Sequence, residues 1–268
     1  MNRIFGFSIY HKPVEEYFDY AASHGLRHLE IDLIKDHSII QTFTAKRIKK
    51  LRELSEDSGI SLSLHAPYNL NLAERIFFMR KSNVTYLKKC FNIAKEINAT
   101  HITCHLGSFN SIKAWPWLRK QMLETVLKSL RELEETCADA EVHLALENAV
   151  TLRDGTEIYF LGDCVSDFEF IFERINCDWI SFCLDIGHAN TNQGHSAYIE
   201  KLSSKMVNLH FHDNKGNEDD HLAPGEGNIC WKSMADELTR INYKGPLVSE
   251  CFEMKPHLAA EILKGYFD

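Results

Sequence analysis

A short segment that begins at His210 concentrates side chains of the kinds that bind metal ions. It reads HFHDNKGNEDDHLAPGEG, and its first twelve residues hold three histidines and four carboxylates. Asp219 and His221 lie two positions apart, so an extended backbone points both side chains in the same direction. Imidazole and carboxylate groups are the usual ligands of zinc and related divalent ions. The segment therefore predicts a loop that binds a metal ion.

Histidines and acids also end six short segments that are rich in apolar and β-branched residues. Taken singly, each has a structural interpretation as a hydrogen-bonded or solvated group. Together they would crowd carboxylates whose mutual repulsion a divalent cation relieves. The six segment ends are His65, His105, Glu147, Asp185, His210 and Glu250. His188, Asp219 and His221 bring the number of candidate ligands to nine. The mixed nitrogen and oxygen set suits Zn²⁺ or Mn²⁺ best, and also Co²⁺ or Fe²⁺, and disfavours Ca²⁺.

Strand-like and helix-like segments alternate along the whole chain. The predicted strands are 3–9, 28–33, 61–67, 101–107, 143–149, 180–188, 206–213 and 246–252. The predicted helices are 14–25, 44–59, 84–98, 117–140, 167–176, 197–205, 231–242 and 256–267. Eight such units close into a barrel whose active site lies at the carboxyl ends of the strands. No G-x-G-x-x-G follows the first strand, which disfavours a doubly wound open sheet. We therefore predict an α/β fold, a single (β/α)8 TIM barrel forming one domain over 1–268.

Composition narrows the class of protein further. The formal net charge is −8, which argues against a globally basic nucleic-acid binder. No apolar run approaches the roughly 20 residues that span a bilayer, and the first residues lack the pattern of a secretory signal. The eight cysteines are scattered without a C-x-x-C pair, which predicts reduced thiols. We expect a cytoplasmic protein with no membrane partner.

Several motifs together resemble the xylose isomerase-like barrels, a superfamily of sugar isomerases and epimerases that also contains the endonuclease IV type of DNA-repair enzyme. The motifs are HAPYNLNLA from His65, LEN at Glu147, CLDIGH ending at His188, the segment from His210 to Gly227, and INYKGPLVSECF around Glu250. The resemblance covers essentially the whole chain. It implies a metal held by Glu147, Asp185, His210 and Glu250. In the nuclease branch His65 and His105 match ligands of a second metal, and His188, Asp219 and His221 match those of a third, so one to three ions are expected.

Two departures favour the sugar enzymes over the nucleases. The nuclease branch usually reads D-T-C-H where this chain has Asp185 to His188, and D-R-H where it has Asp219 to His221. Tyr68 matches an aromatic of the kind that opens DNA, but the loop 34–43 has no arginine. The resemblance therefore implies a divalent-metal-dependent isomerase or epimerase that acts on a sugar or sugar-like ketone through an enediolate. The alternative is an endonuclease IV-like zinc phosphodiesterase acting at abasic sites.

The same resemblance assigns roles within the site. Glu147 and Glu250 would exchange the proton as general acid and base, and His188 would hold a substrate oxygen. The partner would be a small sugar-like molecule, with nucleic acid less favoured, and such barrels often form homo-oligomers. The predicted substrate contacts are His65, His105, Tyr68, Trp115 and Lys215. The loop 151–163 is long enough to act as a lid, and its Arg153 is a candidate contact for an anion.

Overall fold

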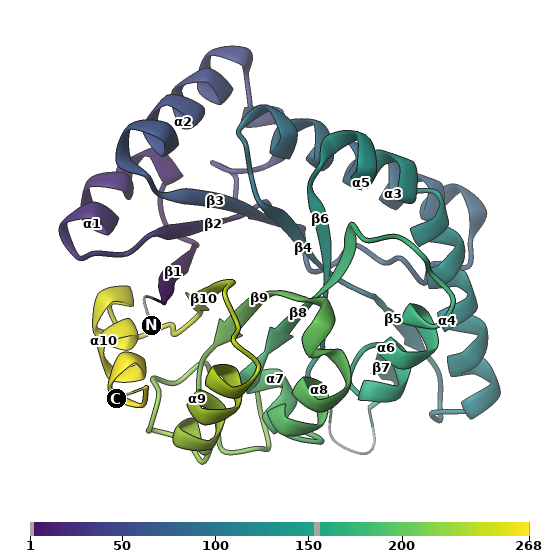
Figure 1. Cartoon of the computed structure of the whole chain (residues 1–268). Coiled ribbons are helices and arrows are strands. Elements are labelled where there is room, and N and C mark those ends of the chain that lie inside the picture. The colour runs from purple at the N-terminus through teal and green to yellow at the C-terminus, as the bar shows by residue number, and fades with distance from the viewer. Residues whose placement is uncertain (1–2, 153–155, 268) are drawn as a thin grey trace.

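The computed structural model describes residues 3–152 and 156–267, and within them eight parallel strands close a barrel (Figure 1). The strands are β1 (Ile4–Ile9), β2 (His28–Asp32), β3 (Ser61–His65), β4 (His101–His105), β6 (His143–Glu147), β8 (Ile180–Asp185), β9 (Met206–Phe211) and β10 (Pro246–Ser249). Their order around the barrel is β1-β10-β9-β8-β6-β4-β3-β2. Each strand therefore pairs with its neighbours in the chain, and the predicted (β/α)8 barrel is confirmed.

Helices surround the barrel and cover its outer face (Figure 1). The α-helices are α1 (Phe18–Ser23), α2 (Ala45–Ser58), α3 (Phe77–Glu96), α4 (Pro116–Arg131), α5 (Glu134–Ala140), α6 (Val165–Phe172), α7 (Ile186–Asn190), α8 (His195–Leu202), α9 (Trp231–Arg240) and α10 (Pro256–Gly265). Three short 3₁₀ turns are η1 (Val14–Glu16), η2 (Ile40–Thr42) and η3 (Ser203–Lys205). None of the helices in the described part of the chain has the length and hydrophobicity of a membrane span. The eight cysteines are unpaired, as predicted.

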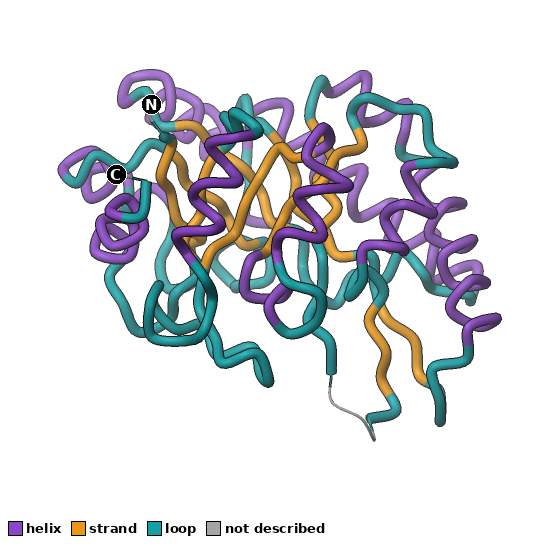
Figure 2. Tube along the Cα trace, turned by 60° about the horizontal axis from the view of Figure 1, so that its bottom comes forward, coloured by secondary structure: helices purple, strands orange, loops and turns teal. Residues whose placement is uncertain are grey.

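Four local features differ from the sequence prediction, and one of them is that the helix predicted over 117–140 is divided into α4 and α5. Helix α3 begins at Phe77, seven residues earlier than predicted, because Phe77 and Phe78 are exposed and give its first turn no amphipathic pattern. The loops after β4 and β6 contain β5 (Ser108–Asn110) and β7 (Ile158–Phe160), which pair antiparallel beside the barrel (Figure 2). Helix α7 follows β8 directly, with Asp185 capping it. The proposed anion contact Arg153 lies outside the described residues.

The interior of the barrel contains an unusual polar layer. Alternate residues of a strand point to opposite faces, so residues of one parity along each strand fill the barrel. Here Glu30 of β2 accepts hydrogen bonds from Ser63, Thr103 and Asn208, which come from three other strands. Barrel interiors are usually filled by Val, Ile and Leu. The polar layer therefore forms the base on which the residues at the strand ends rest.

One buried carboxylate holds the loop that follows β9. Asp213 Oδ1 accepts the backbone N–H of Asn214 at 2.9 Å and that of Ile229 at 3.3 Å. Its Oδ2 accepts the backbone N–H of Gly225 and the indole N–H of Trp231, both at 2.8 Å. These four bonds tie both ends of the loop together, and so they position Asp219 and His221 between them.

We predict that Asp213→Asn destabilises the protein. The new amide group would face donors where a carboxylate oxygen now accepts, so it would break at least one bond and leave buried N–H groups unsatisfied. The free energy of unfolding should fall by roughly 2–4 kcal/mol, measured as a lower urea midpoint at unchanged m-value. Asp236→Asn removes an exposed carboxylate from a surface pair with Lys232, so it serves as the control. Its effect should stay within about 0.5 kcal/mol, and equal effects of the two substitutions would contradict the assignment.

Candidate functional site

The nine predicted ligands meet at the carboxyl end of the barrel. Strand register brings them together: His105 lies opposite Glu147, and Asp185 lies opposite His210. A cavity of about 530 Å³ opens above them. Asp185 and His210 are fully buried beneath this cavity; the other seven line it, namely His65, His105, Glu147, His188, Asp219, His221 and Glu250.

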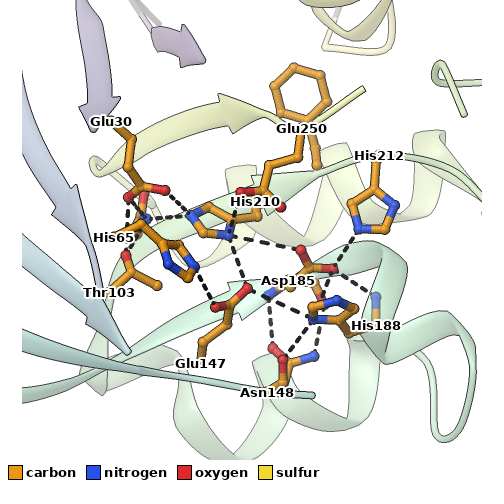
Figure 3. Close-up of polar contacts among 12 residues, drawn as sticks. Glu30, His65, Thr103, Glu147, Asn148, Asp185, His188, His210, His212 and Glu250 are labelled. Atoms are coloured by element: carbon orange, nitrogen blue, oxygen red, sulfur yellow. Dashed lines mark hydrogen bonds and ion pairs between the residues drawn. The ribbon is translucent and has the colours of Figure 1, made fainter. Parts of the chain in front are cut away.

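His210 is the centre of the arrangement (Figure 3). Its Nδ1 lies 3.0 Å from Glu147 Oε1, 3.5 Å from Glu250 Oε1 and 3.9 Å from Asp185 Oδ2. Its Nε2 lies 2.8 Å from Oε1 of Glu30. Because Glu30 occupies Nε2, the Nδ1 nitrogen is directed at the three carboxylates of the predicted four-ligand set.

A second group forms around the other oxygen of Glu147. Its Oε2 lies 3.0 Å from His65 Nε2 and 3.2 Å from His105 Nε2. The Nδ1 of His65 lies 2.7 Å from the carbonyl oxygen of Ala66, to which it must donate its proton. That bond leaves Nε2 of His65 directed into the site.

A third group forms around Asp219. Its Oδ2 lies 3.3 Å from His188 Nε2 and 3.1 Å from His221 Nε2. Both rings are oriented from behind, since Nδ1 of His188 donates to the carbonyl of Asn148 at 2.8 Å and Nδ1 of His221 donates to that of Glu250 at 2.7 Å. The two histidines thus direct the same ring nitrogen at one carboxylate oxygen.

These groups fit a divalent cation by their own chemistry. Metal-binding histidines usually give their second ring nitrogen to a backbone carbonyl or a carboxylate, and His65, His188, His210 and His221 all do so. Asp185 Oδ2 and Asp219 Oδ1 are buried and accept no hydrogen bond within the described chain. Several sets of three or four donor atoms lie within 4.8 Å of one another, including Glu30, His65, His210 and Glu250. A bound cation would give these carboxylate oxygens the partner that they lack, and the anchored imidazoles beside them would be its further ligands.

Burial and the neighbouring charges shift the pKa values of the site. Burial opposes the charge of Glu147, but the neighbouring His105 and His210 outweigh it and hold the pKa of Glu147 well below its usual range. Burial would lower the pKa of His65, yet its bond to Glu147 raises that pKa to about 10. The pKa of His221 rises to about 9 beside Asp219 despite its burial. Without a bound cation, imidazolium protons would therefore compensate the carboxylates.

The predicted substrate contacts fall in different places. His65 and His105 line the cavity, and Tyr68 stands at its edge with 69% of its side chain exposed. Trp115 and Lys215 are not among the described residues that line the cavity. Trp115 precedes α4 and lies under the Lys113 ammonium, and Lys215 is exposed on the loop after β9.

Sequence reasoning missed four residues that support the site. Glu30 binds His210, and His212 Nε2 lies 3.2 Å from Asp185 Oδ1. The hydroxyl of Tyr10 donates to Glu250 Oε1 at 3.0 Å. The Asn148 side chain accepts the N–H of Asp185 and donates to its carbonyl. The alternation of polar and apolar residues in segments such as SLSLH and HITCH was the available signal, because it indicates a polar inner face.

Comparison with known proteins places this geometry in a family. The family model for the xylose isomerase-like TIM barrel matches residues 18–265. An uncharacterized protein of Methanocaldococcus jannaschii is 29% identical over 228 residues, which are 83% of this chain and 75% of that protein. The fructoselysine 3-epimerase of Escherichia coli O157:H7 is 23% identical over 250 residues, 90% of this chain and 86% of the enzyme.

Solved structures of sugar epimerases and related proteins are also similar to this chain. A D-tagatose 3-epimerase-like protein is 28% identical with a TM-score of 0.85, covering 98% of this chain and 96% of that one. The D-psicose 3-epimerase of Clostridium cellulolyticum H10 is 16% identical with a TM-score of 0.79, again over 98% and 96%, and so shares the fold. The family model matches most of this chain, which shows that the chain belongs to the xylose isomerase-like TIM barrel family.

Proposed function

We propose that the protein is a divalent-metal-dependent isomerase or epimerase of a ketose sugar or a sugar-like ketone. One observation carries the proposal: Glu147, Glu250 and Asp185 converge on His210 Nδ1 beneath an open cavity. Two of these carboxylates reach the cavity, where they are placed to exchange a proton with a substrate. The similarity to a fructoselysine 3-epimerase and to a D-tagatose 3-epimerase-like protein supports the same reaction class.

Glu147, Asp185, His210 and Glu250 would hold the cation. When bound, it would act as a Lewis acid on the substrate carbonyl and so make the neighbouring C–H group more acidic. The donor set of three carboxylates and one imidazole suits zinc, manganese, cobalt or iron, and their identity stays a prediction.

The two glutamates would then move the proton. One carboxylate removes it from the carbon beside the carbonyl, and the other returns a proton to that carbon or to its neighbour. Figure 3 shows Glu147 and Glu250 reaching His210 from opposite sides. The Tyr10 hydroxyl orients Glu250, and His65 orients Glu147. Such fixed orientation is what efficient proton transfer requires.

A zinc phosphodiesterase is the second candidate, and the group of Asp219, His188 and His221 favours it. These three residues are oriented as metal ligands although a mononuclear isomerase does not need them. Charge opposes this candidate: none of the described residues lining the cavity is a lysine or arginine, while four are carboxylates. DNA-binding sites hold their phosphates largely through basic side chains.

The proposed reaction predicts exchange of hydrogen with solvent. With manganese present and ketoses dissolved in D₂O, we expect deuterium to enter the carbon next to the carbonyl, followed by nuclear magnetic resonance. Glu147→Gln and Glu250→Gln should each lower the exchange rate by roughly 10²–10⁴-fold, because each removes a proton carrier. Glu253→Gln changes an exposed carboxylate close by and should leave the rate unchanged.

A different result would reverse the ranking of the two candidates. The same preparations are tested for nicking of a duplex that contains an abasic site. Nicking at low protein concentration that Glu147→Gln abolishes, with no deuterium exchange into any ketose, would establish the phosphodiesterase instead.

A further prediction follows from the raised pKa values. The pKa is about 10 for His65 and about 9 for His221, and it lies well above the ordinary value for His188 and His210. At neutral pH these rings carry a proton on both nitrogens and are positively charged, whereas an imidazole that binds a metal must be neutral. Metal binding should therefore release protons, and the apparent affinity should rise with pH up to about 9–10.

Calorimetry in buffers of different ionisation enthalpy counts these protons at about pH 7.5. We expect at least one proton, from His210, and more if His65 and His221 also bind metal. His221→Asn should then release one proton fewer, whereas His11→Asn, at an exposed histidine outside the cavity, should not change the number. Binding without any proton release would contradict the proposed ligand set.

A further inference from the structure

The cavity is larger than a single sugar requires. Its volume is about 530 Å³, whereas a hexose displaces on the order of 200 Å³, roughly seven waters of about 30 Å³ each. A hexose bound at the His210 end would leave space in the outer part of the cavity. Binding sites are usually matched to the ligand they enclose. The remaining volume therefore points to a second part of the substrate.

The chemistry of the walls changes from the base to the mouth. The base holds the imidazoles and carboxylates described above. Further out, the lining is dominated by apolar and aromatic side chains, namely Tyr68, Leu70, Val150, Ile158, Phe160 and Phe252. Several of these are open to solvent, and Ile158 is 44% exposed. Exposed apolar surface that borders a cavity commonly marks a contact for an apolar group of a ligand.

Phe252 makes ring contacts on two sides in this outer wall. Its ring stacks on His221 with centroids 3.9 Å apart and planes at 8°, and His221 stacks on the buried His212 at 3.9 Å and 14°. Tyr10 contacts Phe252 edge-on at 6.0 Å. The ring is nevertheless 60% exposed. A flat apolar face is thus held rigidly beside the cavity, and it can receive a second ring by stacking.

The charges of the described lining residues disfavour an anionic second part. Four carboxylates line the cavity, from Asp32, Glu147, Asp219 and Glu250, and no described lining residue is a lysine or arginine. A phosphate group in the outer half would find no lysine or arginine among these residues. The outer half therefore suits a neutral group.

We propose that the substrate is a ketose or sugar-like ketone that carries a neutral, apolar or aromatic substituent, bound against Tyr68, Ile158 and Phe252. This inference rests on the proposed isomerase or epimerase activity, since it places the sugar at the His210 end. It adds the outer half of the cavity as the region that selects the substrate.

Matched ligands test it. D-fructose and D-tagatose are each compared as the free sugar, the 1-O-benzyl and 6-O-benzyl ethers and the 6-phosphate. Deuterium exchange gives kcat/KM, and calorimetry with manganese-loaded protein gives the affinity. We expect one benzyl ether to exceed its free sugar by about tenfold or more in both measurements, and the phosphate to bind no better than the free sugar.

Variants locate the contact. Tyr68→Ala and Phe252→Ala should lower the ratio of the benzyl ether to the free sugar by about tenfold, and Ile158→Ala should lower it less. The ratio cancels any general damage to the site. Phe78→Ala is the matched control, because this aromatic is 79% exposed and does not line the cavity, so it should leave the ratio unchanged.

Each outcome decides a specific point. Two results together overturn the inference and leave the isomerase proposal standing. The free sugars exchange as fast as their benzyl ethers, and Tyr68→Ala and Phe252→Ala do not alter the ratio of the benzyl ether to the free sugar. Tighter binding of the 6-phosphate also overturns it. No exchange with any ketose overturns the isomerase proposal, and the inference fails as well if calorimetry then shows no preference for the benzyl ethers.

Discussion

The structure depends on compensating carboxylates that are buried inside a barrel. Glu30, Glu147 and Asp185 are almost completely shielded from water, and an isolated charge in such surroundings is strongly unfavourable. His210 solves the problem for two of them, because its two nitrogens contact Glu30 on one side and Glu147 on the other. Removing one partner of such a pair leaves the other charge uncompensated, which is far more damaging than losing a surface ion pair. The central residues of the site are therefore also structural residues.

Strand register makes this compensation possible. Parallel pairing sets Asp185 opposite His210 and His105 opposite Glu147, and alternation along each strand sends these side chains inward. The layer below them is polar as well, with Ser63, Thr103 and Asn208 donating to Glu30. Stability must then come mainly from the layer between strands and helices, where the apolar residues of the other parity are buried. Along each strand, residues of one parity therefore form the polar interior and the site, and residues of the other parity form the hydrophobic core.

This separation explains what the sequence predicts and what it does not. Six of the nine site residues are recognisable because they end strand segments, and strand ends share one edge of a barrel. The other three, His188, Asp219 and His221, are recognisable as metal-binding residue types in the segments that follow. Glu30 lies within the segment HLEIDL, where an acid is normally assigned to a solvated face. Only the polar inner face of the neighbouring strands indicates that Glu30 points into the barrel. The pairing of β5 with β7 joins three-residue strands that are far apart in the chain, and no local pattern predicts it. Tyr10 and His212 lie just beyond strand ends and matter through contacts that only the closed barrel creates.

The anchored histidines also determine how the site would respond to a cation. Without a bound cation, protons on His65, His188, His210 and His221 would balance the carboxylates. The rings of His65, His188 and His221 are held by backbone carbonyls, and that of His210 is held by Glu30. Because these anchors use the nitrogen that faces away from the cavity, a ring can exchange its inner proton for a cation without turning. The site is thus organised so that a cation would need little conformational change to bind. The same rigidity extends outward through the stack of His212, His221 and Phe252, so that the geometry of the ligand set and the shape of the cavity wall are fixed by one set of contacts.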